Sequence, residues 1–206
     1  MLTLTRRTLL LLSATILGTA MLPVPRAWAA AADQASTFIT NLGRDLTAVV
    51  NGPGALHDKQ VALGKIVDGV VDLDDVARFC LGRFWRGATP QQQHEYVAVF
   101  HQVLQQNITG KIGEYQGVTF GVNRAGMRDD NVVVNSTVVR PGNEPNKVDW
   151  LVSMASGGPK IVDVIAEGTS LRLTQRSDYA AFLARNGNSV QALIDAMRRQ
   201  AANPTG

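Results

Sequence analysis

The chain has 206 residues and a formal net charge of +3, from 20 Lys and Arg against 17 Asp and Glu. Three of the basic residues, Arg6, Arg7 and Arg26, lie in the first 29 residues, which contain no acid, so the remainder carries 17 charges of each sign. A nucleic-acid-binding protein needs a basic surface that neutralises phosphates, and this balance excludes that class.

The first 29 residues have the pattern of a cleaved export signal. The arginine pair precedes an uncharged apolar run, residues 9–17, and an A-x-A cleavage site follows at residues 27–29. The apolar run is shorter than a membrane-spanning helix requires. We therefore expect residues 1–29 to be removed after export by a Sec signal or, because the two arginines are adjacent, by a Tat signal.

Helical periodicity dominates the first half of the remaining chain, because apolar residues recur every three or four positions. Asp72, with Asp75 three residues later, has the pattern of a helix N-cap. Thr89 followed by Pro90 predicts another helix start, since proline is favoured at the first helical position. Together these patterns predict helices over residues 32–50, 56–70, 72–87 and 89–112.

Beyond Gly117 the period changes to that of β-strands, and two helices then end the chain. Segments rich in Val, Ile and Thr, joined by Asn, Asp, Gly and Pro turns, predict an antiparallel meander. This order predicts an α+β fold, with helices packed on a curved sheet of about four to five strands. We expect one domain over residues 30–200, a disordered tail over 201–206, and strands at residues 118–122, 131–140, 147–154 and 160–166.

The residue types that carry chemistry are sparse and poorly spaced. His94 and His101 are seven residues apart, without the third ligand or the spacing of a metal site. The single cysteine, Cys80, lies between Phe79 and Leu81 and is predicted to be a small buried hydrophobe. The abundant apolar residues fit either a filled core or the wall of a ligand cavity, and periodicity does not distinguish the two.

Two blocks of the sequence resemble the MlaC/toluene-tolerance family of periplasmic lipid-binding proteins. The first is Leu-Gly-Arg-Phe-Trp-Arg at residues 81–86, followed by Thr-Pro-Gln-Gln at residues 89–92 and by the aromatic residues Tyr96, Phe100 and Tyr115. The second is Val-Asp-Val-Ile-Ala-Glu-Gly-Thr-Ser at residues 162–170 and the Arg-Ser-x-Tyr helix after it. The two blocks stand in the same order and spacing as in the family.

The resemblance implies an apolar cavity between sheet and helices that takes up the acyl chains of a lipid, without catalysis and without a cofactor, the lipid being cargo. It also implies a periplasmic shuttle that exchanges phospholipid between an outer-membrane lipoprotein complex and an inner-membrane ABC transporter carrying an MCE-domain ring. The pocket residues that we predict are Phe84, Tyr96, Phe100, Leu104, Val132, Val134, Trp150, Val152, Met154 and Val164. Arg83 and Arg86 are candidates for the lipid phosphate, or else for ion pairs with acids.

Three alternatives stay open at this point. Some relatives are associated with hopanoid lipids, so a hopanoid carrier of the same family is an alternative to the phospholipid carrier. A small enzyme on a cone-shaped α+β fold would place His94 or His101 and an Asp in the cavity. An interaction protein would have a filled core and no cavity.

Overall fold

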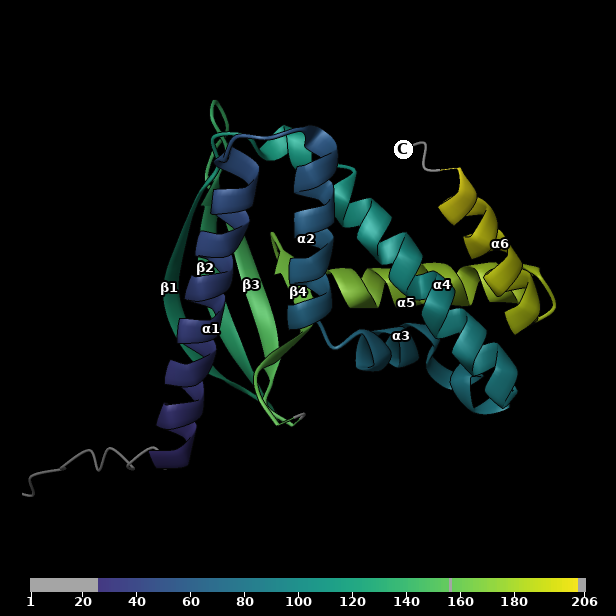
Figure 1. Ribbon diagram of the computed structural model, residues 1–206. Helices are drawn as coiled ribbons and strands as arrows, with labels where there is room; N and C mark the ends of the chain where they lie inside the picture. Colours follow the sequence, from purple (N-terminus) through teal and green to yellow (C-terminus); the bar gives the residue numbers. More distant parts are fainter. Residues whose placement is uncertain (1–25, 156, 204–206) are drawn as a thin grey trace, which may run out of the picture.

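The computed structural model describes residues 26–155 and 157–203, so most of the expected signal lies outside the described residues. These residues form two lobes that lie side by side (Figure 1). One lobe is a sheet covered by a helix, and the other is a group of helices. The helices are α1 (Arg26–Asn51), α2 (Leu56–Val70), α3 (Leu73–Leu81), α4 (Pro90–Thr109), α5 (Leu171–Arg185) and α6 (Val190–Ala202), with 3₁₀ turns η1 (Gly82–Gly87) and η2 (Ile112–Tyr115). None of the described helices combines the length and apolar character needed to cross a bilayer.

The five strands form one open antiparallel sheet in sequence order, which confirms the predicted meander. They are β1 (Thr119–Arg128), β2 (Asn131–Val139), β3 (Asn146–Ser153), β4 (Lys160–Ala166) and β5 (Thr169–Ser170). Val132 pairs with Val152 and Val134 with Trp150, so these four side chains share one face, as the alternation predicts. Helix α1 covers that face, and Ile39 packs against the three valines in one buried cluster.

The second lobe packs α3, α4, α5 and α6 around its own apolar core. Tyr96, Leu183 and Ile194 from three of these helices are fully buried there. Helix α4 begins as predicted, because the Thr89 hydroxyl accepts the Gln92 amide at 3.2 Å and the Gln92 side chain accepts the Thr89 amide at 3.1 Å. This capping box fixes where the chain enters the lobe.

The predicted helix over residues 72–87 is wrong in its second half. Helix α3 ends at Leu81, and Gly82 adopts a φ of +59°, which an L side chain rarely tolerates. A Cβ at Gly82 would also lie 3.1 Å from the Arg176 Nε on α5, so this turn allows α5 to pack closely. The aromatic residues that follow therefore lie in the 3₁₀ turn η1.

Three other predicted boundaries differ from the structure. Helix α4 ends at Thr109, and Ile112 lies in the separate 3₁₀ turn η2. Strand β1 continues to Arg128, since a bulge between Val122 and Arg124 keeps its polar half paired with β2. Helix α6 includes residues 201 and 202 of the expected tail.

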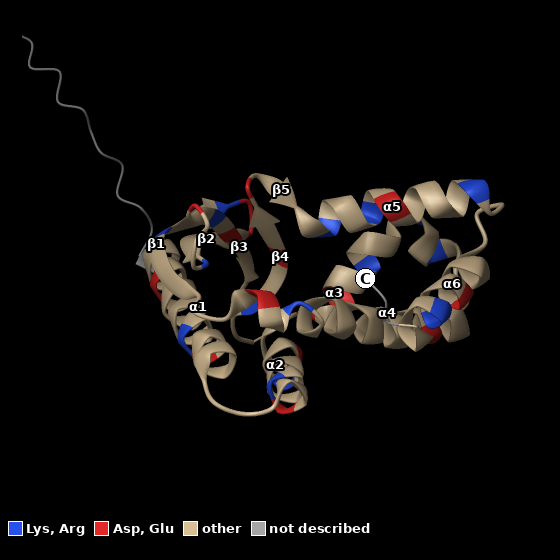
Figure 2. Ribbon diagram, turned by 90° about the horizontal axis from the view of Figure 1, so that it is seen from above, with Lys and Arg blue, Asp and Glu red and all other residues tan. Residues whose placement is uncertain are grey.

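Strand β4 lies where the two lobes meet. The amide of Asp72, between α2 and α3, donates to the Ile161 carbonyl at 2.9 Å, and Val71 forms a parallel bridge to the same residue. At its other end, β4 turns into β5, which leads directly into α5. Figure 2 shows β4, α4, α5 and α6 arranged around one central region.

Candidate functional site: an apolar cavity between the lobes

A cavity of about 680 Å³ lies between β4 and the helical lobe. This volume falls within the range of about 300–1,000 Å³ that is usual for small-ligand sites. Its apolar wall comes from the α2–α3 junction, α3, α4, β4 and the start of α5. The wall residues are Val71, Val76, Cys80, Phe100, Val103, Leu104, Ile108, Ile161, Val162, Val164, Leu171 and Tyr179.

Helical spacing explains how α4 and α5 present so many groups to one cavity. On α4, Phe100, Leu104 and Ile108 recur every four residues and therefore share one face. On α5, Leu171, Gln175 and Tyr179 recur in the same way, with Tyr179 deepest and Leu171 half exposed. The cavity is thus the gap that two amphipathic helices leave against the last long strand.

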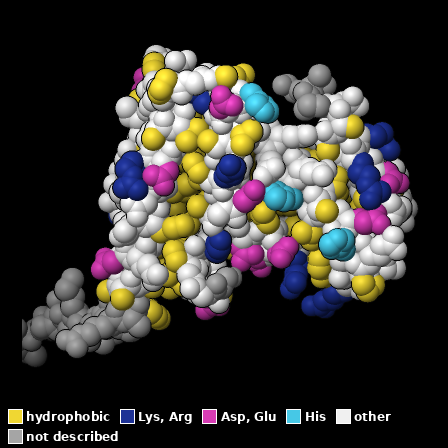
Figure 3. All heavy atoms as spheres, in the orientation of Figure 1, with side chains coloured by type: hydrophobic (Ala, Val, Ile, Leu, Met, Phe, Trp, Pro, Cys, Tyr) yellow, Lys and Arg dark blue, Asp and Glu magenta, His cyan; other side chains and the backbone are white. Residues whose placement is uncertain are grey.

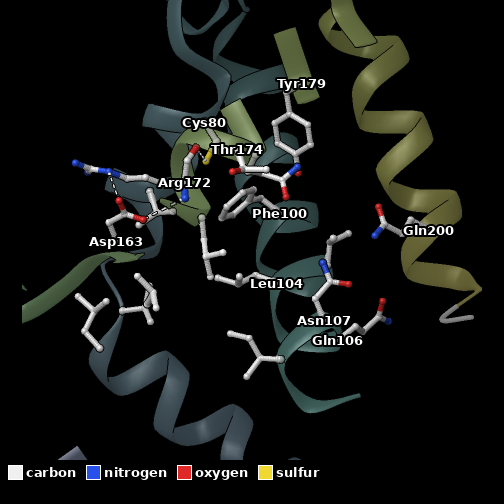
Figure 4. Close-up of a pocket in the computed structure, with 18 of the residues that line it drawn as sticks. Cys80, Phe100, Leu104, Gln106, Asn107, Asp163, Arg172, Thr174, Tyr179 and Gln200 are labelled. Atoms are coloured by element: carbon white, nitrogen blue, oxygen red, sulfur yellow. Dashed lines mark hydrogen bonds and ion pairs between the residues drawn. The ribbon is translucent and has the colours of Figure 1, made fainter. Parts of the chain in front are cut away.

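Uncharged amide side chains gather where the cavity reaches the surface. Gln106 and Asn107 come from α4, Gln175 from α5, and Gln200 and Asn203 from the end of α6; we call these five the carboxamide rim. Figure 4 shows the Asn107 and Gln200 side chains extending into the space between α4 and α6. Lys111, exposed beyond the end of α4, is the cation of the lining nearest to this rim in sequence.

Two charged residues in the cavity wall neutralise each other. The buried Asp163 carboxylate accepts the Ser170 hydroxyl at 2.6 Å and the Arg172 amide at 3.1 Å. Its Oδ2 atom lies 3.5 Å from the Arg172 Nε, and the guanidinium stacks over the Phe79 ring at 4.2 Å. The dashed lines in Figure 4 show the contacts between Asp163 and Arg172 beside the cavity. This ion pair joins β4 to the first turn of α5 rather than presenting a free charge to a ligand.

Two other buried titratable groups of the cavity wall, Cys80 and Tyr179, stay neutral. Burial raises the pKa of the Cys80 thiol to about 12, and the thiol lies 3.6 Å from the Arg172 carbonyl. Burial likewise raises the pKa of Tyr179 well above its ordinary value. A protonated thiol is a weak nucleophile, so Cys80 serves as a small apolar wall group, as its sequence context predicts.

Three of the ten predicted pocket residues, Phe100, Leu104 and Val164, line this cavity. The predicted sheet-face residues lie elsewhere, in the cluster beneath α1: Val132, Val134, Trp150, Val152 and Met154. Trp150 also donates through its Nε1 to the Ser136 hydroxyl at 2.9 Å. Figure 3 shows a band of hydrophobic side chains along the boundary between α1 and α2 on this side of the molecule.

The remaining predicted residues lie in the helical lobe and are not among the residues that line the cavity. Tyr96 is fully buried, and its hydroxyl donates to the Ala77 carbonyl at 3.0 Å. Phe84 packs against the same lobe core from η1. Arg83 and Arg86 are exposed on η1, where the Arg83 guanidinium stacks 4.9 Å from the Phe84 ring. The structure therefore does not bring these two arginines to the cavity.

The sequence reasoning missed the carboxamide rim and the Arg172 side of the ion pair. Asparagine and glutamine near helix ends look like ordinary surface residues, so only the tertiary arrangement of α4, α5 and α6 reveals the rim. A sequence signal did exist for Arg172, because it follows Asp163 by nine residues across a strand and a tight turn.

The histidines do not approach the cavity. The His101 Nε2 lies 2.6 Å from Asp68 Oδ1 in a shallow contact between α2 and α4. Neither His94 nor His101 is among the cavity residues, and the described residues contain no cluster of three metal-ligating side chains. The arrangement that the enzyme alternative requires is therefore not present in the described part of the chain.

The chain is similar in sequence or in fold to two known proteins. The toluene tolerance protein ttg2D of Pseudomonas putida is 29% identical over 153 residues, which are 70% of this chain and 67% of that protein. The phospholipid-binding protein of Ralstonia solanacearum, solved in complex with a phospholipid, superposes with a TM-score of 0.74 at 24% identity. That alignment covers 83% of this chain and 98% of the solved chain, and it shows that the two share a fold.

A match to a family model assigns the chain to a family, because the match covers most of the folded chain. The model described as MlaC protein matches residues 45–199, from within α1 to within α6. The match includes both of the sequence blocks that carry the resemblance, and three of the five carboxamide-rim residues, Gln106, Asn107 and Gln175. The chain belongs to the MlaC family.

Proposed function

We propose that this protein is a periplasmic carrier that holds a phospholipid by burying acyl chain in the cavity between β4 and α4–α6. The observation that supports this most strongly is the cavity itself, whose wall is apolar and whose two buried charges neutralise each other. The phospholipid-bound structure of the same fold supports the same ligand class.

The energetics of such a carrier favour exchange over irreversible capture. Burying an acyl chain from water gains about 0.8 kcal/mol per CH₂ group. The chain comes from a bilayer, however, where it is already dry, so transfer between bilayer and cavity is nearly balanced. The direction of transport must then come from partners, and we propose an outer-membrane lipoprotein complex and an inner-membrane ABC transporter with an MCE-domain ring.

Organic extraction of the purified protein, followed by mass spectrometry, tests the ligand class. We expect phospholipid in the extract, in a fixed ratio to protein. A hopanoid in its place would assign the chain to the hopanoid-carrying alternative. An extract without lipid, from protein expressed in cells with intact membranes, would refute the carrier.

A charge placed in the wall tests whether this cavity is the binding site. Leu104→Glu puts a carboxylate among apolar groups, so the folded protein should lose most of its bound lipid. Gln102→Glu is the matched control, because Gln102 is exposed on the same helix and does not line the cavity. If the folded Leu104→Glu variant retains normal lipid, the site lies elsewhere, and the cluster beneath α1 becomes the next candidate.

A further inference from the structure

The carboxamide rim differs in chemistry from both the apolar wall and the ordinary charged surface. Five amide side chains from three helices border one opening, together with the Thr174 hydroxyl. Among the lining residues the only carboxylate is Asp163, and its oxygens are occupied by Ser170 and Arg172. The rim therefore offers hydrogen bonds without an acidic group.

Three of these amides are available to a ligand. Gln106 donates to the Ala201 carbonyl at 2.8 Å and thereby ties α4 to α6. By contrast, the side chains of Asn107, Gln175 and Gln200 make no hydrogen bond to any described residue. Asn107 and Gln200 extend from opposite sides of the opening in Figure 4. A lipid headgroup held between the apolar wall and solvent would therefore contact both side chains.

The chemistry of an amide decides which headgroup it suits. Each carboxamide has an acceptor oxygen and a donor NH₂ group, and a hydroxyl likewise donates and accepts, so hydroxyls satisfy both ends of an amide. An ammonium group only donates, which would leave the NH₂ groups unmatched, and the rim has no carboxylate to balance its charge. Lys111 offers one cation, which suits a single phosphate.

We propose that the carboxamide rim is a headgroup subsite that selects lipids whose headgroup is a polyol on a single phosphate, such as phosphatidylglycerol, over lipids with an ammonium headgroup. This inference rests on the proposed lipid-carrier function and specifies its substrate class. Each hydrogen bond that only the polyol can complete should favour it by about 2- to 10-fold.

A competition experiment tests this selection. The protein is loaded from vesicles of equimolar phosphatidylglycerol and phosphatidylethanolamine with identical acyl chains, and the bound lipids are extracted and quantified by mass spectrometry. We expect phosphatidylglycerol to be enriched about threefold or more over the vesicles. Equal proportions in protein and vesicles would overturn the headgroup subsite while leaving the carrier intact, whereas no bound lipid of either kind would refute the carrier as well.

Variants of the rim separate hydrogen bonding from packing. In Asn107→Leu/Gln200→Leu, the bound ratio should return to that of the vesicles while total bound lipid stays the same, because both residues lie on the surface. Gln102→Leu, an exposed glutamine of α4 outside the cavity lining, should keep the enrichment. Retained enrichment of phosphatidylglycerol in the double variant would show that the rim does not select the headgroup.

A second vesicle pair separates hydrogen bonding from charge. Phosphatidylglycerol and phosphatidic acid are both anionic, but only the former has a polyol headgroup. We expect phosphatidylglycerol to be preferred in this pair also, and Lys111→Met to lower the uptake of both lipids while preserving their ratio. Equal uptake of the two by the unmodified protein would mean that charge alone explains any preference, which would overturn the proposal.

Discussion

The Tyr96 hydroxyl donates a hydrogen bond of 3.0 Å to the Ala77 carbonyl and so joins α4 to α3 beneath the cavity. Both residues are fully buried, and burial raises the pKa of Tyr96 far above its ordinary value, so the hydroxyl remains a donor at any ordinary pH. The same ring packs edge-on against Tyr179, a residue of the cavity wall. The contact therefore holds the floor of the cavity in place.

Tyr96→Phe should reduce the free energy of unfolding by about 1 kcal/mol, because it removes one buried hydrogen bond while preserving the ring. Urea denaturation followed by circular dichroism measures the change. Tyr115→Phe is the control, since Tyr115 is exposed and no hydrogen bond of its hydroxyl is found among the described residues. Equal effects of the two substitutions would show that the Tyr96 hydrogen bond adds nothing to stability.

Asp163→Ala should be the more damaging change, with a loss of about 3 kcal/mol, because it leaves a largely buried Arg172 without its counter-charge. The same substitution removes the acceptor of Ser170, which caps α5. Denaturant unfolding again gives the measurement, with Asp178→Ala, an exposed aspartate of α5, as the control. A loss below about 1 kcal/mol would place this ion pair in the class of solvated surface pairs.

Local periodicity predicts four of the five strands and the faces that their residues share, but not the polar half of β1 or the short β5. Val132, Val134 and Val152 do lie together, because alternation in a strand fixes the face of each side chain. It does not fix which element covers that face. Here α1 lies over these valines, and the cavity is found beyond β4, where α4 and α5 leave a gap.

The carboxamide rim depends on long-range contacts, and so does the boundary between α3 and η1. Gly82 ends α3 at a positive φ beside Arg176, which is 94 positions later in the chain. Asn107 and Gln200 are 93 positions apart in sequence and border the same cavity only because α4 packs against α6. No local pattern carries either relationship, whereas the Thr89 capping box, which is local, is predicted correctly.

Gly43 allows α1 to approach the sheet closely, whereas Gly69 in α2 has open space around it. We therefore expect opposite effects when each of these two helical glycines is replaced by alanine. A Cβ at Gly43 would lie 2.0 Å from the Phe120 ring, so Gly43→Ala must displace the ring and should destabilise the fold by about 1–3 kcal/mol. Gly69→Ala in α2 meets nothing within 4 Å and should stabilise by about 0.5–1 kcal/mol through helix propensity. Thermal unfolding distinguishes the two, and a stabilising Gly43→Ala would show that α1 is not held against β1 as described.

Cys80 predicts how stability falls at alkaline pH. Burial raises the pKa of its thiol from 9.0 to about 12, so between these values the unfolded chain releases a proton that the folded chain keeps. The stability contributed by the protonated thiol is therefore complete below pH 9 and is lost as the pH rises, at up to about 1.4 kcal/mol per pH unit. Cys80→Ala should remove this part of the slope.

The measurement is the difference in unfolding free energy between the two proteins, from urea denaturation at intervals between pH 8 and about 11. Burial, the largest cause of the raised pKa values of Tyr96 and Tyr179, acts in both proteins, so the part of the tyrosine contribution that burial causes cancels in the difference. We expect the two curves to be parallel below pH 9 and to converge above it as the native protein loses stability faster. Curves that stay parallel throughout would mean that the thiol ionises in the folded protein, and hence that water reaches the cavity wall at Cys80.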